Sequence, residues 1–138
     1  MQRIYLNGVI DVMLNTKPSM SELFSPVREG LSAVEERMRE YTPDQHAALS
    51  AAIDHILASG GKRIRPAMSL LSSGLFGANF DHAVSLAAAV EMLHTASLVH
   101  DDLIDGSLLR RGAPTLNASW SPAATVLTGD YVFARAAD

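Results

Sequence analysis

The segment Glu91–Gly112 reads EMLHTASLVHDDLIDGSLLRRG and combines an apolar helical pattern with three aspartates and two arginines. At about 100° per residue of helix, six of its side chains fall within roughly a 100° arc. They are Glu91, His94, Leu98, Asp101, Asp102 and Asp105. Because a buried carboxylate costs several kcal/mol unless a positive charge lies opposite, this acidic stripe predicts a bound cation.

The composition indicates one all-α domain. The chain has 138 residues, enough for a hydrophobic core, and 48% of them are hydrophobic with few aromatics. It has no cysteine, which excludes disulfides and thiolate metal sites and suits a cytoplasmic protein. The net charge of −4 argues against a general nucleic-acid binder. The apolar N-terminal residues are too few to span a bilayer, and no signal-peptide cleavage site follows them.

Periodicity and capping residues predict three helices before the glycine pair. We expect residues 1–17 to form an amphipathic helical segment that leads into the domain. The sequence Ser-Met-Ser-Glu at 19–22 has the form of a capping box and begins a helix that ends near Tyr41. A second start signal at 42–45, with proline suited to the first turn, begins a helix that stops at Ser59, Gly60 and Gly61.

Three further helices are expected after the glycine pair. One follows GGKRIRP at 60–66 and runs to Gly77. The next spans 81–104, about 36 Å at 1.5 Å per residue, and is apolar all round except along the acidic stripe, so we expect a central helix buried on most sides. After a loop at 106–120, a last helix starts at Ser121 and is still helical where the sequence ends.

The aspartates are well placed to share a divalent cation. Asp101 and Asp105 are four residues apart on one helix, so their carboxylates lie about 5–6 Å apart and repel each other. Mg²⁺ would relieve this repulsion, because it takes one or two protein carboxylates and completes its octahedron with water and phosphate oxygens. The alternative is a solvated acidic patch at the end of a helix.

Two basic pairs suggest anionic ligands. Lys62 and Arg65 follow two glycines and lie at a helix start, where free backbone N–H groups favour anions. Arg110 and Arg111 follow the aspartates directly, and their planar guanidinium groups match phosphate oxygens. One anionic ligand would be held at the aspartates through a metal ion, and another would be bound directly by basic side chains. The alternative is a glycine cap and a loop that carry solvated charges.

The histidines of this segment differ in position. His94 lies on the arc of the stripe, which favours a donor to phosphate over a histidine of the core. His100 lies nearly opposite and is expected to be structural. Glu91 and His94 also form an E-x-x-H pair, as in di-iron helical bundles, but the sequence has no second such pair.

Four motifs together resemble a known family. GGKRIRP, HTASLVHDDLID, LLRRGAPTLN and GDYVFARA occur in the order and spacing of the first half of trans-isoprenyl diphosphate synthases, the polyprenyl synthetases. The resemblance runs from about Leu31 to the end. It implies an all-α bundle around a central cavity and a homodimer. It also implies that an allylic diphosphate, bound through Mg²⁺, loses its diphosphate and that its allylic group is transferred to isopentenyl diphosphate. Membrane contact would be at most peripheral, through the product.

The resemblance also implies roles for individual residues. Those that would bind isopentenyl diphosphate are Lys62, Arg65, His94 and Arg111. Asp101 and Asp105 would bind Mg²⁺, with Asp102 supporting them, and Arg110 would contact the allylic diphosphate. These three aspartates and Arg110 form the expected catalytic group.

Product length in this family depends on the fourth and fifth residues before the first aspartate. Here these are Ser97 and Ala96, which are both small. Nothing bulky would block the growing chain at this level. By this resemblance we expect a longer-chain synthase.

The chain departs from the family in one respect. The family has a second aspartate-rich motif on a later helix, and residues 1–138 contain none. We therefore expect the N-terminal portion of one polyprenyl synthetase domain, which ends within its last helix and is catalytically incomplete alone. The alternatives are a non-catalytic or complementing subunit of a heteromeric prenyl synthase, and a helical interaction module.

Overall fold

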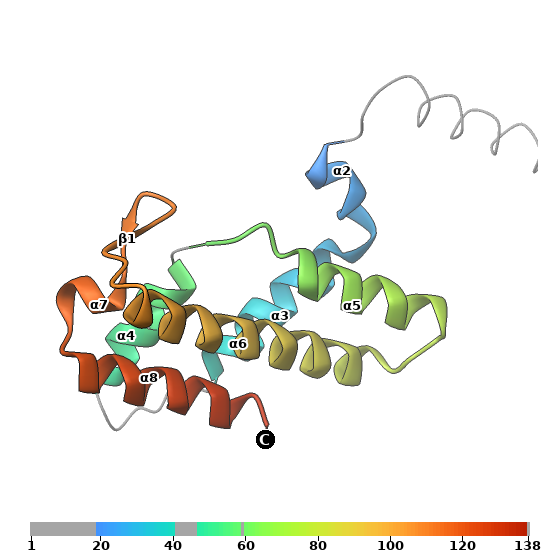
Figure 1. Cartoon of the computed structure of the whole chain (residues 1–138). Coiled ribbons are helices and arrows are strands. Elements are labelled where there is room, and N and C mark those ends of the chain that lie inside the picture. The colour runs from blue at the N-terminus through green and yellow to red at the C-terminus, as the bar shows by residue number, and fades with distance from the viewer. Residues whose placement is uncertain (1–18, 41–46, 59, 138) are drawn as a thin grey trace, which may run out of the picture.

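A computed structural model describes residues 19–40, 47–58 and 60–137, and within these ranges the fold is all-α, as predicted (Figure 1). One antiparallel pair of two-residue strands is the exception. The elements in chain order are α2 (Met20–Leu23), the 3₁₀ helix η1 (Ser25–Val27), α3 (Arg28–Glu40), α4 (Ala47–Ala58), α5 (Ile64–Leu75), α6 (Phe80–Ile104), β1 (Leu109–Arg110), β2 (Ala113–Pro114), α7 (Leu116–Ser119) and α8 (Pro122–Arg135).

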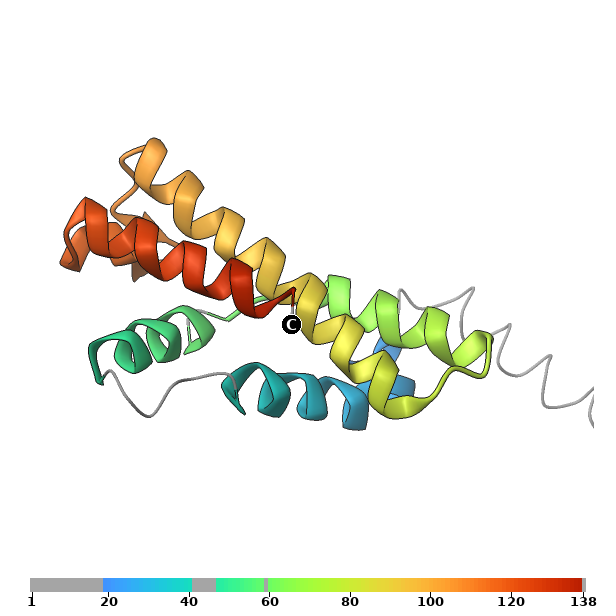
Figure 2. The same cartoon turned by 90° about the horizontal axis from the view of Figure 1, so that it is seen from below.

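The 25-residue helix α6 organises the fold. In Figure 2, α8 runs along its C-terminal half, whereas α3 and α5 lie against its N-terminal half. The contacts are close because small side chains fill this surface of α6, and these are Ala83, Ala87, Ala88 and Ala96. Val34 and Met38 of α3 and Leu70 of α5 complete the core.

One face of α6 remains outside this core. Leu86 is 56% exposed, Leu93 is 38% exposed and Ile104 is 80% exposed. The expectation of a helix buried on most sides therefore holds for the surface toward α3, α5 and α8, but not for this face. By length and composition α6 could also cross a membrane, although a helix at the core of a bundle has the same properties.

Local caps explain where the helices begin. The Asn79 side chain accepts a hydrogen bond from the backbone N–H of His82 and caps α6. Ser121 caps α8 in the same way, with Pro122 at the first helical position. The capping box predicted at Ser19 and Glu22 is present, with both reciprocal bonds.

The helix predicted from Ser19 to Tyr41 is interrupted. Pro26 has no backbone N–H for the carbonyl of Glu22, and the Ser25 hydroxyl donates to that carbonyl at 2.8 Å instead. The chain therefore forms α2, η1 and α3 in succession. The expected helix over 1–17, the end at Tyr41 and the start signal at 42–45 lie outside the described residues.

Three other boundaries differ from the prediction. Helix α5 ends at Leu75 rather than Gly77, because the N–H of Ala78 bonds to the carbonyl of Ser73 at 3.0 Å and closes the helix. The expected loop at 106–120 contains the β1–β2 hairpin and α7. Helix α8 ends at Arg135, with Ala136 as its cap, whereas the prediction extends the helix to the end of the sequence.

Candidate functional site

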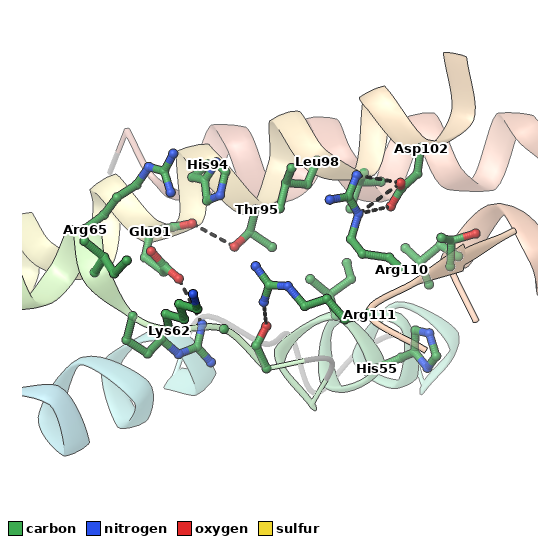
Figure 3. Close-up of a pocket in the computed structure, with 18 of the residues that line it drawn as sticks. His55, Lys62, Arg65, Glu91, His94, Thr95, Leu98, Asp102, Arg110 and Arg111 are labelled. Carbon is green, nitrogen blue, oxygen red and sulfur yellow. Dashed lines mark hydrogen bonds and ion pairs between the residues drawn. The ribbon is translucent and has the colours of Figure 1, made fainter. Parts of the chain in front are cut away.

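A cavity of about 580 Å³ lies between α6, the loop before α5, and the β1–β2 hairpin (Figure 3). The side chains on its walls include all of the basic residues predicted for the site, and these are Lys62, Arg65, His94, Arg110 and Arg111. Ile56, Leu98, Val99 and Leu116 supply apolar surface. The structure thus brings the two basic pairs together with one edge of the acidic stripe.

The loop at 60–65 is shaped by left-handed residues. Gly60 has φ +65°, and Arg63, which caps α5, has φ +50°. This turn places Lys62 before the helix and Arg65 in its first turn, both exposed and both lining the cavity. Free N–H groups at the start of a helix also favour an anion here.

The acidic stripe is divided between two environments. Glu91, His94, Leu98 and Asp102 line the cavity. Asp101 and Asp105 do not, and both are exposed at the C-terminal end of α6. A 100° arc is wide enough for one edge to face the cavity while the other faces solvent.

Asp102 is bound by Arg110. Nη2 of Arg110 lies 2.7 Å from Oδ1 of Asp102, and Nε lies 2.8 Å from Oδ2, so the pair is bidentate. Asp102 is 7% exposed. Its hydrogen bonds raise the pKa of Arg110 further above the usual value, and the charges of Asp101 and Asp105 act in the same direction. The Arg110 charge is therefore partly neutralised by Asp102 while it stays close to the other two aspartates.

The donor chemistry at Asp101 and Asp105 fits a hard divalent cation. Their side chains are exposed, four residues apart on α6, and neither forms an ion pair among the described residues. Within 19–40, 47–58 and 60–137 no cluster of three or more His, Asp or Glu side chains could hold a metal. Two carboxylates suffice for Mg²⁺ only if water or phosphate oxygens complete its coordination.

His94 lies among positive charges. Partial burial lowers the pKa of His94 below its ordinary value of 6.5, and the Arg65 charge lowers it further. Glu91 opposes this shift, while Arg111 and Arg110 add to it. The imidazole is therefore neutral near pH 7 and can donate one N–H bond to an anion. His100 faces α8 instead, with Nε2 3.3 Å from the carbonyl of Val126, as expected for a structural residue.

The hairpin and the glycine loop meet directly. Arg111 has a left-handed backbone with φ +53°, and its Nη1 donates a hydrogen bond to the carbonyl of Gly60. A Cβ at Gly61 would lie 2.9 Å from the same nitrogen, so a larger residue here would displace the Arg111 guanidinium. His55 of α4 adds a second tether to the hairpin, with Nε2 2.8 Å from the carbonyl of Pro114.

Sequence reasoning missed two residues that shape the cavity. Arg63 bonds to Glu91 at 3.1 Å, and this pairing also gives Glu91 a partner other than a metal. The GGKRIRP motif contains Arg63, so its position was visible although its role was not. His55 had no such signal, because its partner Pro114 lies 59 residues further along the chain.

The fold and the cavity define an all-α protein in which two basic loops lie beside an aspartate-bearing helix. The polyprenyl synthetase family model matches residues 46–138, and the chain belongs to the polyprenyl synthetase family. The predictions of this family and of an all-α fold are thereby confirmed.

Individual relatives agree with this assignment. The chain is 44% identical over 118 residues to an all-trans-nonaprenyl-diphosphate synthase (geranyl-diphosphate specific) of Rhodobacter capsulatus, covering 85% of this chain and 36% of that protein. It is 41% identical over 116 residues to heptaprenyl diphosphate synthase component 2 of Geobacillus stearothermophilus, covering 84% and 36%. The chain thus spans about a third of the length of these relatives.

A solved structure shows the same arrangement of helices. The polyprenyl synthase of Caulobacter crescentus, complexed with calcium and isoprenyl diphosphate, superposes with a TM-score of 0.81 at 40% identity. The match covers 88% of this chain and 37% of that one. The described helices therefore correspond to one part of a larger helical protein.

Proposed function

We propose that this chain provides the isopentenyl diphosphate site and the first metal-binding motif of a prenyltransferase. The observation that carries the proposal is the convergence of Lys62, Arg65, His94 and Arg111 on one cavity. The whole protein would condense isopentenyl diphosphate with an allylic diphosphate to give a polyprenyl diphosphate.

The charges on the cavity wall support a ligand with several negative charges. Five lysine and arginine side chains line it, together with the carboxylates of Glu91 and Asp102. These two carboxylates are paired with Arg63 and Arg110. The remaining cations, which have no carboxylate partner among the described residues, are Lys62, Arg65 and Arg111. A diphosphate would supply the missing negative charge and accept their hydrogen bonds.

Asp101 and Asp105 would hold Mg²⁺ at the allylic diphosphate, where its charge would stabilise the departing oxygens. Arg110, oriented by Asp102, would also bind that diphosphate. His94 would donate one N–H bond to isopentenyl diphosphate. Leu98, with the apolar side chains beside it, would keep water from the allylic carbon while the carbon–oxygen bond breaks.

Titration with isopentenyl diphosphate tests this assignment. We expect calorimetry on residues 1–138 to show binding in EDTA, and Lys62→Ala together with Arg65→Ala to weaken it by roughly 100-fold, because two charge-assisted contacts at about 1.5 kcal/mol each are lost. Asp101→Asn with Asp105→Asn should leave this binding unchanged but abolish the Mg²⁺-dependent binding of an allylic diphosphate. If the parent chain and both double variants bound isopentenyl diphosphate with equal affinity, the proposal would be refuted.

The 138-residue chain alone should show no turnover. It carries one aspartate motif, and the opposite carboxylates expected for the family are not in its sequence. Radiolabelled isopentenyl diphosphate incorporated by purified 1–138 measures this directly. Substantial Mg²⁺-dependent incorporation would show that one motif suffices.

Product length and assembly are further parts of this proposal. Ser97 and Ala96, the fourth and fifth residues before the first aspartate, are both small, which supports a longer-chain product. Chromatography of products from the complete enzyme tests this, and products of only C15 or C20 would contradict it.

We further propose a cytoplasmic homodimer, which touches membranes at most through its product and does not bind nucleic acid. Light scattering and cell fractionation test these points.

A complementing subunit is a second candidate. The relative in Geobacillus stearothermophilus is called component 2 of its synthase, so at least one similar protein is named as part of a multicomponent enzyme. In that case activity would appear only after mixing with a second polypeptide. Activity of the complete protein by itself would exclude this role.

A further inference from the structure

Arg63 occupies an unusual position at the edge of the cavity. Its φ of +50° and ψ of 32° lie in the left-handed region, which costs an L-residue about 1–2 kcal/mol. Arg111 is the other non-glycine residue in this conformation among those the structure describes. A left-handed arginine therefore needs compensating interactions that glycine would not need.

Three helices supply that compensation. Nε of Arg63 lies 3.2 Å from Oε1 of Glu35 on α3, and Nη1 lies 3.1 Å from Oε1 of Glu91 on α6. Nη2 lies 3.5 Å from the carbonyl of Leu57 at the end of α4. One guanidinium group thus connects α3, α4 and α6 to the loop that precedes α5. Its side chain is 18% exposed and that of Glu91 is 8% exposed, so solvent screens this pair only weakly.

The location of this connection matters because of the neighbouring residues. Lys62 and Arg65 lie on either side of Arg63 in the sequence, and both line the cavity (Figure 3). The turn at Arg63 sets the direction in which Lys62 leaves the loop and the angle at which the first turn of α5 begins. If the guanidinium were absent, this turn would have to rely on Gly60 and Gly61, which have the widest conformational freedom.

We propose that Arg63 is a positioning residue for the diphosphate site: held by Glu91 and Glu35, it fixes the turn that presents Lys62 and Arg65 to the ligand. This inference rests on the proposed function. Arg63 also lines the cavity, but its guanidinium is held by Glu35 and Glu91, so we assign its effect on the ligand to the placement of Lys62 and Arg65. The alternative is that Arg63 only neutralises the buried carboxylate of Glu91. The experiment below separates this role from the positioning role.

The test compares two variants of the 138-residue chain. Arg63→Gly keeps the left-handed turn accessible without strain but removes the guanidinium and leaves Glu91 unpaired. Arg63→Gly with Glu91→Gln removes that unpaired charge as well. Affinities for inorganic pyrophosphate and for isopentenyl diphosphate are measured in EDTA by calorimetry, and melting temperatures by circular dichroism.

We expect both variants to bind each ligand at least tenfold more weakly than the parent chain. Arg63→Lys should recover part of the affinity, because lysine keeps one charged contact but cannot reach both glutamates. If Arg63 only neutralises Glu91, the double variant recovers the parent affinity, and this result overturns the positioning role. Mg²⁺-dependent binding of an allylic diphosphate should change little.

A matched control separates binding from general stability. Arg37 also connects α3 to α6, through Asp81 at 2.7 Å, but it lies outside the cavity lining. Arg37→Gln should lower the melting temperature and leave both affinities at the parent value. Equal losses of affinity in Arg37→Gln and Arg63→Gly would mean that the effect is one of folding, and would overturn the inference. If the parent chain binds neither ligand, the proposed function fails together with the positioning role.

Discussion

Replacement of Gly129 by alanine tests how closely α8 approaches α6. A Cβ at this position would lie 2.2 Å from Nε2 and 2.6 Å from Cδ2 of His100. These separations are far below van der Waals contact, so the imidazole would have to leave its place. It would then lose its 3.3 Å hydrogen bond to the carbonyl of Val126 and its contact with Asp130 at 3.5 Å.

Two opposing effects decide the magnitude. Alanine is favoured over glycine within a helix by about 1 kcal/mol. Overpacking costs about 1–3 kcal/mol, and the lost hydrogen bond adds about 0.5–1.5 kcal/mol. We therefore expect Gly129→Ala to lower the free energy of unfolding by about 0.5–3.5 kcal/mol, or roughly 2–14 °C in melting temperature for a chain of this size.

Urea denaturation followed by circular dichroism measures the change, and two further variants make the result specific. Gly74 lies in α5 with no atom within 4 Å of an added Cβ, so Gly74→Ala should be neutral or stabilising. His100→Ala should remove the clash, so that alanine at 129 becomes stabilising in that background. A Gly129→Ala variant as stable as Gly74→Ala would refute the described contact.

Other predictions concern the cavity. The folded state lowers the pKa of His94 below 6.5, so just below that pH the unfolded state binds more protons than the folded state. The free energy of unfolding should therefore fall as the pH drops through this window. Melting temperatures measured from pH 7.5 to 5 should decrease with pH, and His94→Gln should make that decrease smaller. Asp102→Ala should cost about 1.5–3 kcal/mol, since it removes the charged hydrogen bonds of the mostly buried pair with Arg110, and denaturant titration measures this. Gly61→Ala should displace Arg111 and weaken pyrophosphate binding in calorimetry by several-fold with little change in melting temperature, because the clash is with a flexible side chain; unchanged binding would argue against a role for this contact.

The sequence predicted the elements whose signals are local. Helix α6 was expected over 81–104 and occupies Phe80–Ile104, because apolar periodicity and Asn79 mark its start and Gly106, with φ +65°, follows its end. The capping box at Ser19 was also predictable, since both partners lie within four residues. The break near Pro26 had a local signal too, but apolar periodicity continues across it and masked the break.

The candidate site was predictable in composition but not in pairing. Helical angles placed Asp101 and Asp102 on one arc, yet only the position of the hairpin decides that Asp102 turns inward and bonds to Arg110. The contacts of Arg63 with Glu35 and Glu91 join residues 28 positions apart, so they depend on how three helices pack. Periodicity along one helix contains no information on such contacts.

The alanine surface of α6 has a consequence for the spacing of groups within the cavity. Alanine has no side-chain rotamers, so α6 meets its neighbours through contacts that cannot adjust by rotamer changes. The same helix also carries His94 and Asp102 on the wall of the cavity, eight residues or about 12 Å apart along its axis. The helix therefore holds His94 and Asp102 at a fixed separation. Two ligand groups that bind at these residues keep that separation, whatever the length of the ligand between them.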